Sequence, residues 1–223
     1  MIKSLTTESA IDTMAATLFE QGVFKIENYL SGEKLQNLHD EVFDKCQNEA
    51  GHYEFGRNYR GEQISTFAKD SAIFQVYDAE WMRNLHQFYT GRTDNYGMNV
   101  FATHDYKFEG GLARNGWLHF DRHWRLKFFI YLTDIDESSG AFGCSAGSRA
   151  LGQKLRANAW GAKNYEGVKN RIELDYPELL DKWPCEPVEA PAGTLIVFDT
   201  DTFHKGGKCD EGKERLIVRL HCG

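Results

Sequence analysis

Several features that mark other classes of protein are missing from this chain of 223 residues. Its five cysteines include no close pair, which fits neither a disulfide framework nor a zinc site built from thiolates. No stretch approaches the roughly 18 consecutive apolar residues of a membrane span, and the first residues lack the apolar run of a signal peptide. These absences predict a cytoplasmic protein with reduced thiols and no membrane partner.

Positive charge is also scarce, since 26 Lys and Arg residues face 33 Asp and Glu residues, which gives a formal net charge of -7. The long-range field of such a chain repels nucleic acids and anionic membranes, so we predict neither as a partner. Only four prolines interrupt the chain, and 41% of its residues are hydrophobic. That composition suits one domain over residues 1–223, while the oligomeric state cannot be inferred.

Hydrophobic periodicity divides the chain into a helical beginning and a β-rich remainder. Apolar residues three and four apart predict helices over 7–21 and 32–47, so residues 1–50 form a mainly helical N-terminal part. Short runs rich in β-branched and aromatic residues then recur with the rhythm of a β-sandwich or barrel. The polar segment 151–184, with a short helix over 176–183, is predicted to be an insertion between strands.

Two histidines and an aspartate form a candidate metal site. His119 and Asp121 stand two apart in GWLHFDR, and because side chains alternate along an extended strand, both leave on the same side. His204 follows the apolar run GTLIVFD, and the three residues together match the facial triad that holds non-haem iron(II). The alternative is ordinary structure, because His-x-Asp often forms a plain hydrogen bond and a histidine at a strand end often caps a turn.

Arg215 opens the strand-like run RLIVRLHC, on which Arg215, Ile217, Arg219 and His221 face one way. A cation in a half-apolar strand needs an anionic partner, and a guanidinium matches a carboxylate in bidentate geometry. A dicarboxylate co-substrate that reaches the metal with its other end would be such a partner. A salt bridge to an Asp or Glu at the strand edge is the alternative.

These motifs resemble the phytanoyl-CoA dioxygenase-like group of the 2-oxoglutarate- and iron(II)-dependent oxygenases over nearly the whole chain. The resemblance covers EQGVFKIENYLSGEKL, GWLHFDR with LKFFIYLTDIDESSGAF, and APAGTLIVFDTDTFHKGG with an arginine eleven residues after its histidine. In AGSRALG, Ala146 and Arg149 replace the proline and the histidine of the family's Pro-Gly-Ser-His turn, a departure that touches no metal ligand. The resemblance implies that His119, Asp121 and His204 bind iron(II) and that Arg215 binds 2-oxoglutarate.

The implied fold is mainly β with N-terminal helices, a double-stranded β-helix (a jelly roll, or cupin-like barrel) with the metal at one mouth. The implied reaction uses O2 to convert 2-oxoglutarate to succinate and CO2 while a small molecule is hydroxylated, with ascorbate as a supporting reductant. Halogenating relatives replace the carboxylate ligand by a small residue. The presence of Asp121 therefore implies hydroxylation in preference to chlorination.

Other residues are candidates for the surroundings of the metal. Lys127 and Tyr131 share one face of RLKFFIYL, and Asn99 lies in YGMNVF. All three are candidates for binding 2-oxoglutarate, and each has an ordinary structural role as its alternative.

A local excess of basic residues between 104 and 127 contrasts with the acidic chain. Arg122, Arg125 and Trp117 are therefore candidates for contacting a small polar or anionic substrate. A solvated basic face explains the same pattern.

Two other functions remain open at this point. A cupin-like metalloenzyme that does without 2-oxoglutarate has a similar barrel, although it has no need of Arg215. A non-catalytic jelly-roll binding or sensor protein would keep the ligands and bind 2-oxoglutarate without forming succinate.

Overall fold

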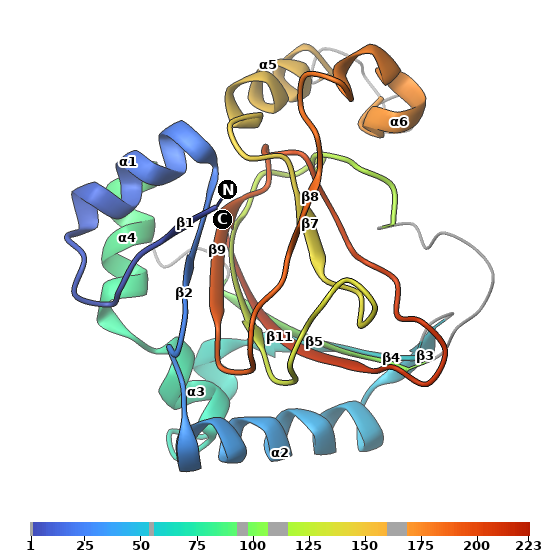
Figure 1. Cartoon of the computed structure of the whole chain (residues 1–223). Coiled ribbons are helices and arrows are strands. Elements are labelled where there is room, and N and C mark those ends of the chain that lie inside the picture. The colour runs from blue at the N-terminus through green and yellow to red at the C-terminus, as the bar shows by residue number, and fades with distance from the viewer. Residues whose placement is uncertain (1, 54–55, 93–97, 107–115, 160–168) are drawn as a thin grey trace.

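Two sheets form the centre of the chain in a computed structural model that describes residues 2–53, 56–92, 98–106, 116–159 and 169–223 (Figure 1). The larger sheet contains, in spatial order, β1 (Lys3–Ser4), β2 (Val23–Ile26), β9 (Leu195–Asp199), β6 (Leu126–Tyr131), β11 (Arg215–Cys222), β5 (Asn99–Asp105), β4 (Gly56–Gln63) and β3 (Gly51–Tyr53). The smaller contains β10 (His204–Lys205), β7 (Phe142–Cys144) and β8 (Glu186–Val188). Apart from the parallel pair β1–β2, the strand pairs are antiparallel.

Helices cover the outer face of the larger sheet (Figure 1). They are α1 (Ile11–Gln21), α2 (Gly32–Asn48), α3 (Ala72–Tyr77) and α4 (Glu80–Thr90). Between β7 and β8 the chain forms α5 (Arg149–Ala159) and α6 (Ile172–Asp175), and short 3-10 helices occupy Ile64–Thr66 and Pro177–Leu179. The mainly β architecture with N-terminal helices is thus the predicted one.

Strict alternation along the central strands separates two apolar layers. In β11, Leu216, Val218 and Leu220 face outward and join the core under the helices. Ile217 faces inward and packs with Phe129 and with residues of β7 and β8, so this second core lies between the two sheets. The inner face of β11 and its neighbours is therefore the surface on which a site between the sheets is built.

One glycine fixes the junction between the first helix and the sheet. Gly22 ends α1 with φ 77° in the left-handed region. A Cβ on this residue would lie 1.9 Å from Thr202 Oγ1, so both the turn and the close approach exclude a side chain. The contact packs the N-terminal helix against the loop that leads into β10.

Three local predictions differ from the structure. The helices α3 and α4 were not predicted, and the helix expected over 176–183 is a short 3-10 helix at Pro177–Leu179 followed by a turn. GWLHFDR is not a regular strand, because His119 forms only isolated bridges.

Among the described residues, no helix has the length and apolar character needed to cross a membrane.

Candidate active site

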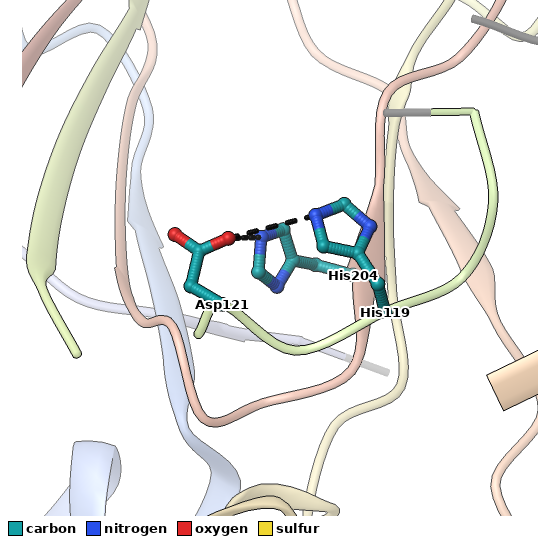
Figure 2. A group of neighbouring side chains, drawn as sticks. All are labelled: His119, Asp121 and His204. Carbon is teal, nitrogen blue, oxygen red and sulfur yellow. Dashed lines mark ion pairs between the residues drawn. The ribbon is translucent and has the colours of Figure 1, made fainter. Parts of the chain in front are cut away.

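The backbone brings two histidines side by side. His119 and His204 form an isolated antiparallel bridge in which each N–H donates to the other's carbonyl, at 2.9 and 2.8 Å. Two residues later, the Asp121 N–H donates to Thr200 O at 2.9 Å. His119 and Asp121 therefore point to the same side, and His204 joins them from β10 (Figure 2).

The three side chains converge on one point, as Figure 2 shows. Asp121 Oδ1 lies 3.5 Å from both His119 Nε2 and His204 Nε2, and the three ligand atoms all lie within 4.8 Å of one another. Each imidazole Nδ1 lies 2.7 Å from a backbone carbonyl, that of Trp117 for His119 and that of Thr202 for His204. A carbonyl only accepts, so each Nδ1 carries the hydrogen and each Nε2 presents a lone pair to the centre.

The electrostatics favour the forms that bind a metal. Burial, with the neighbouring His119, lowers the pKa of His204 to about 4, so its imidazole is neutral. Burial alone would raise the pKa of Asp121, but Lys127 Nζ at 2.6 Å and the two histidines hold it well below the usual range. Two neutral imidazoles and a carboxylate fit iron(II) and leave positions for co-substrate and oxygen.

Arg215 has a protein partner in this structure. Its Nε donates to Asp105 Oδ2 at 2.9 Å, its Nη2 donates to the same oxygen, and its Nη1 donates to Gly140 O. Asp105 lies directly opposite Arg215 on β5, and both side chains are almost fully buried. The salt bridge kept open as an alternative is therefore present, and the binding of 2-oxoglutarate by Arg215 stays a prediction.

The comparisons with known proteins decide the family. The family described as phytanoyl-CoA dioxygenase (PhyH) matches residues 18–215. The chain belongs to the phytanoyl-CoA dioxygenase family. No match was found among curated proteins.

Solved structures of low sequence identity share the fold. The epimerase SnoN, in complex with Fe3+, alpha ketoglutarate and nogalamycin RO, aligns with a TM-score of 0.71 at 13% identity, covering 95% of this chain and 82% of that one. EctD from S. alaskensis, in its apoform, aligns with a TM-score of 0.65 at 13% identity, covering 99% and 80%. These similarities confirm the double-stranded β-helix, although the described strands form no closed barrel.

Iron(II) and 2-oxoglutarate are the cofactors of the phytanoyl-CoA dioxygenase family, and the residues around the candidate metal site suit both. Three cations, Lys127, Arg215 and Arg219, lie on the inner faces of β6 and β11, and two of them are paired with carboxylates. Buried polar atoms of Thr103 and His221 on the same face have no hydrogen-bond partner among the described residues. Such a face suits a dicarboxylate that brings its own hydrogen-bond acceptors.

The other candidates for binding the co-substrate occupy different positions. Lys127 reaches Asp121, one of the candidate metal ligands. The Tyr131 hydroxyl donates to Val188 O at 3.0 Å and accepts from the Phe142 N–H at 3.1 Å, so it ties the two sheets together. Asn99 stands at the start of β5, on the inner face opposite His221.

The candidates for binding substrate are spread around the edge of the site. Trp117 is half-buried and supplies the carbonyl that orients His119. Arg125 is half-buried just before β6 and donates to Trp124 O at 2.7 Å, whereas Arg122 is exposed. Lys107 and Arg114 of the same basic segment lie outside the described residues.

Arg149, where the family has a histidine, has an observed structural role. Its Nε donates at 2.9 Å to Asp199, which is fully buried at the end of β9. The same carboxylate accepts from Tyr89 at 2.7 Å and from Trp124 at 2.9 Å. This network fixes the start of the loop that carries His204.

Proposed function

We propose that this member of the phytanoyl-CoA dioxygenase family hydroxylates a small polar or anionic metabolite and releases succinate and CO2. The observation that carries the proposal is the cluster of His119, Asp121 and His204, whose Nε2 and carboxylate atoms face one point. Asp121 keeps the third ligand position filled by protein, which favours hydroxylation over the transfer of a bound halide.

Iron(II) bound with 2-oxoglutarate and O2 supplies the oxidation of an unreactive C–H bond. The protein supplies orientation and exclusion of water. Backbone carbonyls hold both imidazoles in the tautomer that leaves Nε2 free, and Lys127 holds Asp121 in its charged form. On one side of His204, the rings of Phe198 and Phe142 lie 5.0 and 6.0 Å away, centre to centre, and keep that flank apolar.

We propose that Arg215 anchors the distal carboxylate of 2-oxoglutarate by exchanging its present partner, Asp105. The exchange keeps the guanidinium paired with a carboxylate, while Asp105 gives up this partner. Lys127, Tyr131 and Asn99 stay candidates for binding 2-oxoglutarate as well. Arg122, Arg125 and Trp117 stay candidates for substrate contact, and the cytoplasmic location also stays a prediction.

A screen of metabolites tests the proposed function. The iron(II)-loaded protein is supplied with 2-oxoglutarate, ascorbate and O2, and succinate is measured with each candidate and without any. A true substrate raises succinate formation and yields one hydroxylated product per succinate. Oxidation of a substrate without any 2-oxoglutarate would favour the cupin-like alternative. Tight binding of 2-oxoglutarate with no succinate from any candidate would favour a sensor.

A further inference from the structure

The inner face of β4, β5 and β11 gathers buried polar atoms that lack a partner. Paired residues of antiparallel strands point to the same side, and the register puts five such atoms on this face. They are Asn58 Oδ1, Thr103 Oγ1, Asp105 Oδ1, Arg219 Nε and His221 Nε2, none with a hydrogen bond among the described residues. Buried polar atoms are nearly always paired, so their concentration on one face indicates a surface built to receive a ligand.

Arg219 is the unusual member of this group, because it is the cation without a carboxylate. Arg215 pairs with Asp105 and Lys127 pairs with Asp121, whereas no hydrogen bond or ion pair involves Arg219 within the described parts of the chain. Its guanidinium lies 5.6 Å from the centre of the Phe129 ring, a contact that orients the charge without neutralising it. Burial lowers the pKa of Arg219 to about 10, so the group is still a cation at neutral pH.

The position of Arg219 separates it from Arg215. The two arginines are four residues apart on one face of β11, about 13 Å along the strand. Arg219 lies opposite Phe129 on β6. The next inward-facing residue of β11, His221, lies opposite Lys127. Because Lys127 contacts Asp121, Arg219 lies toward the end of the inner face that is nearer the candidate metal site, where a substrate must lie to be oxidised.

Charge balance indicates what Arg219 is for. A divalent metal and the dianion 2-oxoglutarate offset each other, and Asp105 and Asp121 offset Arg215 and Lys127. Among the described inward-facing groups of β5, β6 and β11, one positive charge, that of Arg219, is then left over. We propose that Arg219 binds a carboxylate of the substrate, so the substrate is a small carboxylic acid presented to the metal by its acidic end. This assignment rests on the proposed function, and it narrows the substrate class.

The first test compares Arg219→Met with Arg215→Met in the iron(II)-loaded protein without oxygen. Titration with 2-oxoglutarate should show a loss of affinity of roughly 30-fold or more in Arg215→Met, and a change below about threefold in Arg219→Met. An equal loss in Arg219→Met would overturn the inference, because Arg219 would then hold the co-substrate. Failure of the wild type to bind 2-oxoglutarate would instead refute the proposed function.

The second test uses stability, which needs no substrate. A cation kept unpaired for binding weakens the ligand-free fold, so Arg219→Met should leave the melting temperature unchanged or raise it. Arg215→Met leaves the buried Asp105 without its partner, so it should lower the melting temperature. A drop of equal size in both variants would show that Arg219 is a structural residue, and the inference would fail.

The third test uses acetate as the probe carboxylate and acetamide as its neutral match. Both are titrated against the protein loaded with iron(II) and 2-oxoglutarate, without oxygen, and the melting temperature is followed. Acetate should stabilise the wild type more than acetamide does, and Arg219→Met should abolish the difference while exposed Lys34→Met, which removes a positive charge from α2, keeps it. Equal responses to the two probes in the wild type, or an acetate preference retained in Arg219→Met, would refute the assignment.

Discussion

Asp105→Asn tests two properties of Arg215: how much its salt bridge with Asp105 stabilises the fold, and whether it binds 2-oxoglutarate in place of Asp105. In the ligand-free protein both members of the pair are almost fully buried, and one carboxylate oxygen accepts from two guanidinium nitrogens. Removing the charge from one side of a buried pair costs roughly 3 to 5 kcal/mol, and because asparagine keeps an oxygen acceptor we expect the lower end, about 3 kcal/mol. Urea unfolding of the metal-free protein measures this loss.

The same substitution should act in the opposite direction on the co-substrate. Asp105 now competes for the guanidinium, so Asp105→Asn frees Arg215 and removes a repelling charge. A charge-assisted pair is worth about 1.5 to 3 kcal/mol, so 2-oxoglutarate affinity should rise by roughly 10- to 150-fold in an anaerobic titration. Exposed Asp44→Asn is the charge control and should change neither quantity. If Asp105→Asn binds 2-oxoglutarate no better than wild type, Arg215 does not exchange its partner as proposed.

Further predictions concern the support of the site. Asp199→Ala should lower the free energy of unfolding by roughly 3 to 5 kcal/mol, because Arg149 loses its fully buried carboxylate partner. Exposed Glu49→Ala is the control and should cost less than about 0.5 kcal/mol in the same urea titration. Burial and the nearby Lys127 push the pKa of His221 far below its usual 6.5, so below about pH 6.5 the unfolded chain binds a proton that the native state does not. The free energy of unfolding therefore decreases as the pH falls, by up to about 1.4 kcal/mol per pH unit. His221→Gln should make this dependence on pH shallower, and an unchanged dependence would contradict the lowered pKa of His221.

The relation between His119 and Asp121, two of the candidate metal ligands, could be predicted from the sequence because it is local. Alternation along an extended segment places His119 and Asp121 on one side whether or not the segment is a regular strand. The structure retains only an isolated bridge there, yet the side chains still converge with His204. Their roles as ligands rest on this geometry and stay predictions until metal binding is measured.

The partner of Arg215 could not be predicted, because it depends on strand order and register. The sequence indicated that Arg215 needs an anion, but not that β11 lies beside β5 with Asp105 directly opposite. The same register gives Arg219 no carboxylate among the residues that the structure describes, since Phe101 and Phe129 occupy the opposite positions. Alternation had already placed both arginines on one face, and only the neighbouring strands distinguish them.

The helix α3 was missed for a different reason. Its sequence AIFQVY is apolar and partly β-branched, so its local preference is as much for a strand as for a helix. Glu41 of α2 accepts from the Ala72 N–H at 2.6 Å, and the Ser71 hydroxyl accepts from the Phe74 N–H at 3.2 Å. The start of α3 is thus capped partly by a residue about thirty positions away, which no local pattern reveals.

The central claim is that His119, Asp121 and His204 hold iron(II) in a form that binds 2-oxoglutarate. The most direct measurement adds both to the protein without oxygen and records the weak visible absorption band of an iron-bound 2-oxo acid. The account predicts a band that saturates at one iron and one 2-oxoglutarate per chain, and that is lost in His119→Ala, Asp121→Ala and His204→Ala while each variant stays folded. No band at saturating 2-oxoglutarate in the wild type, or an undiminished band in any of the three variants, would contradict it.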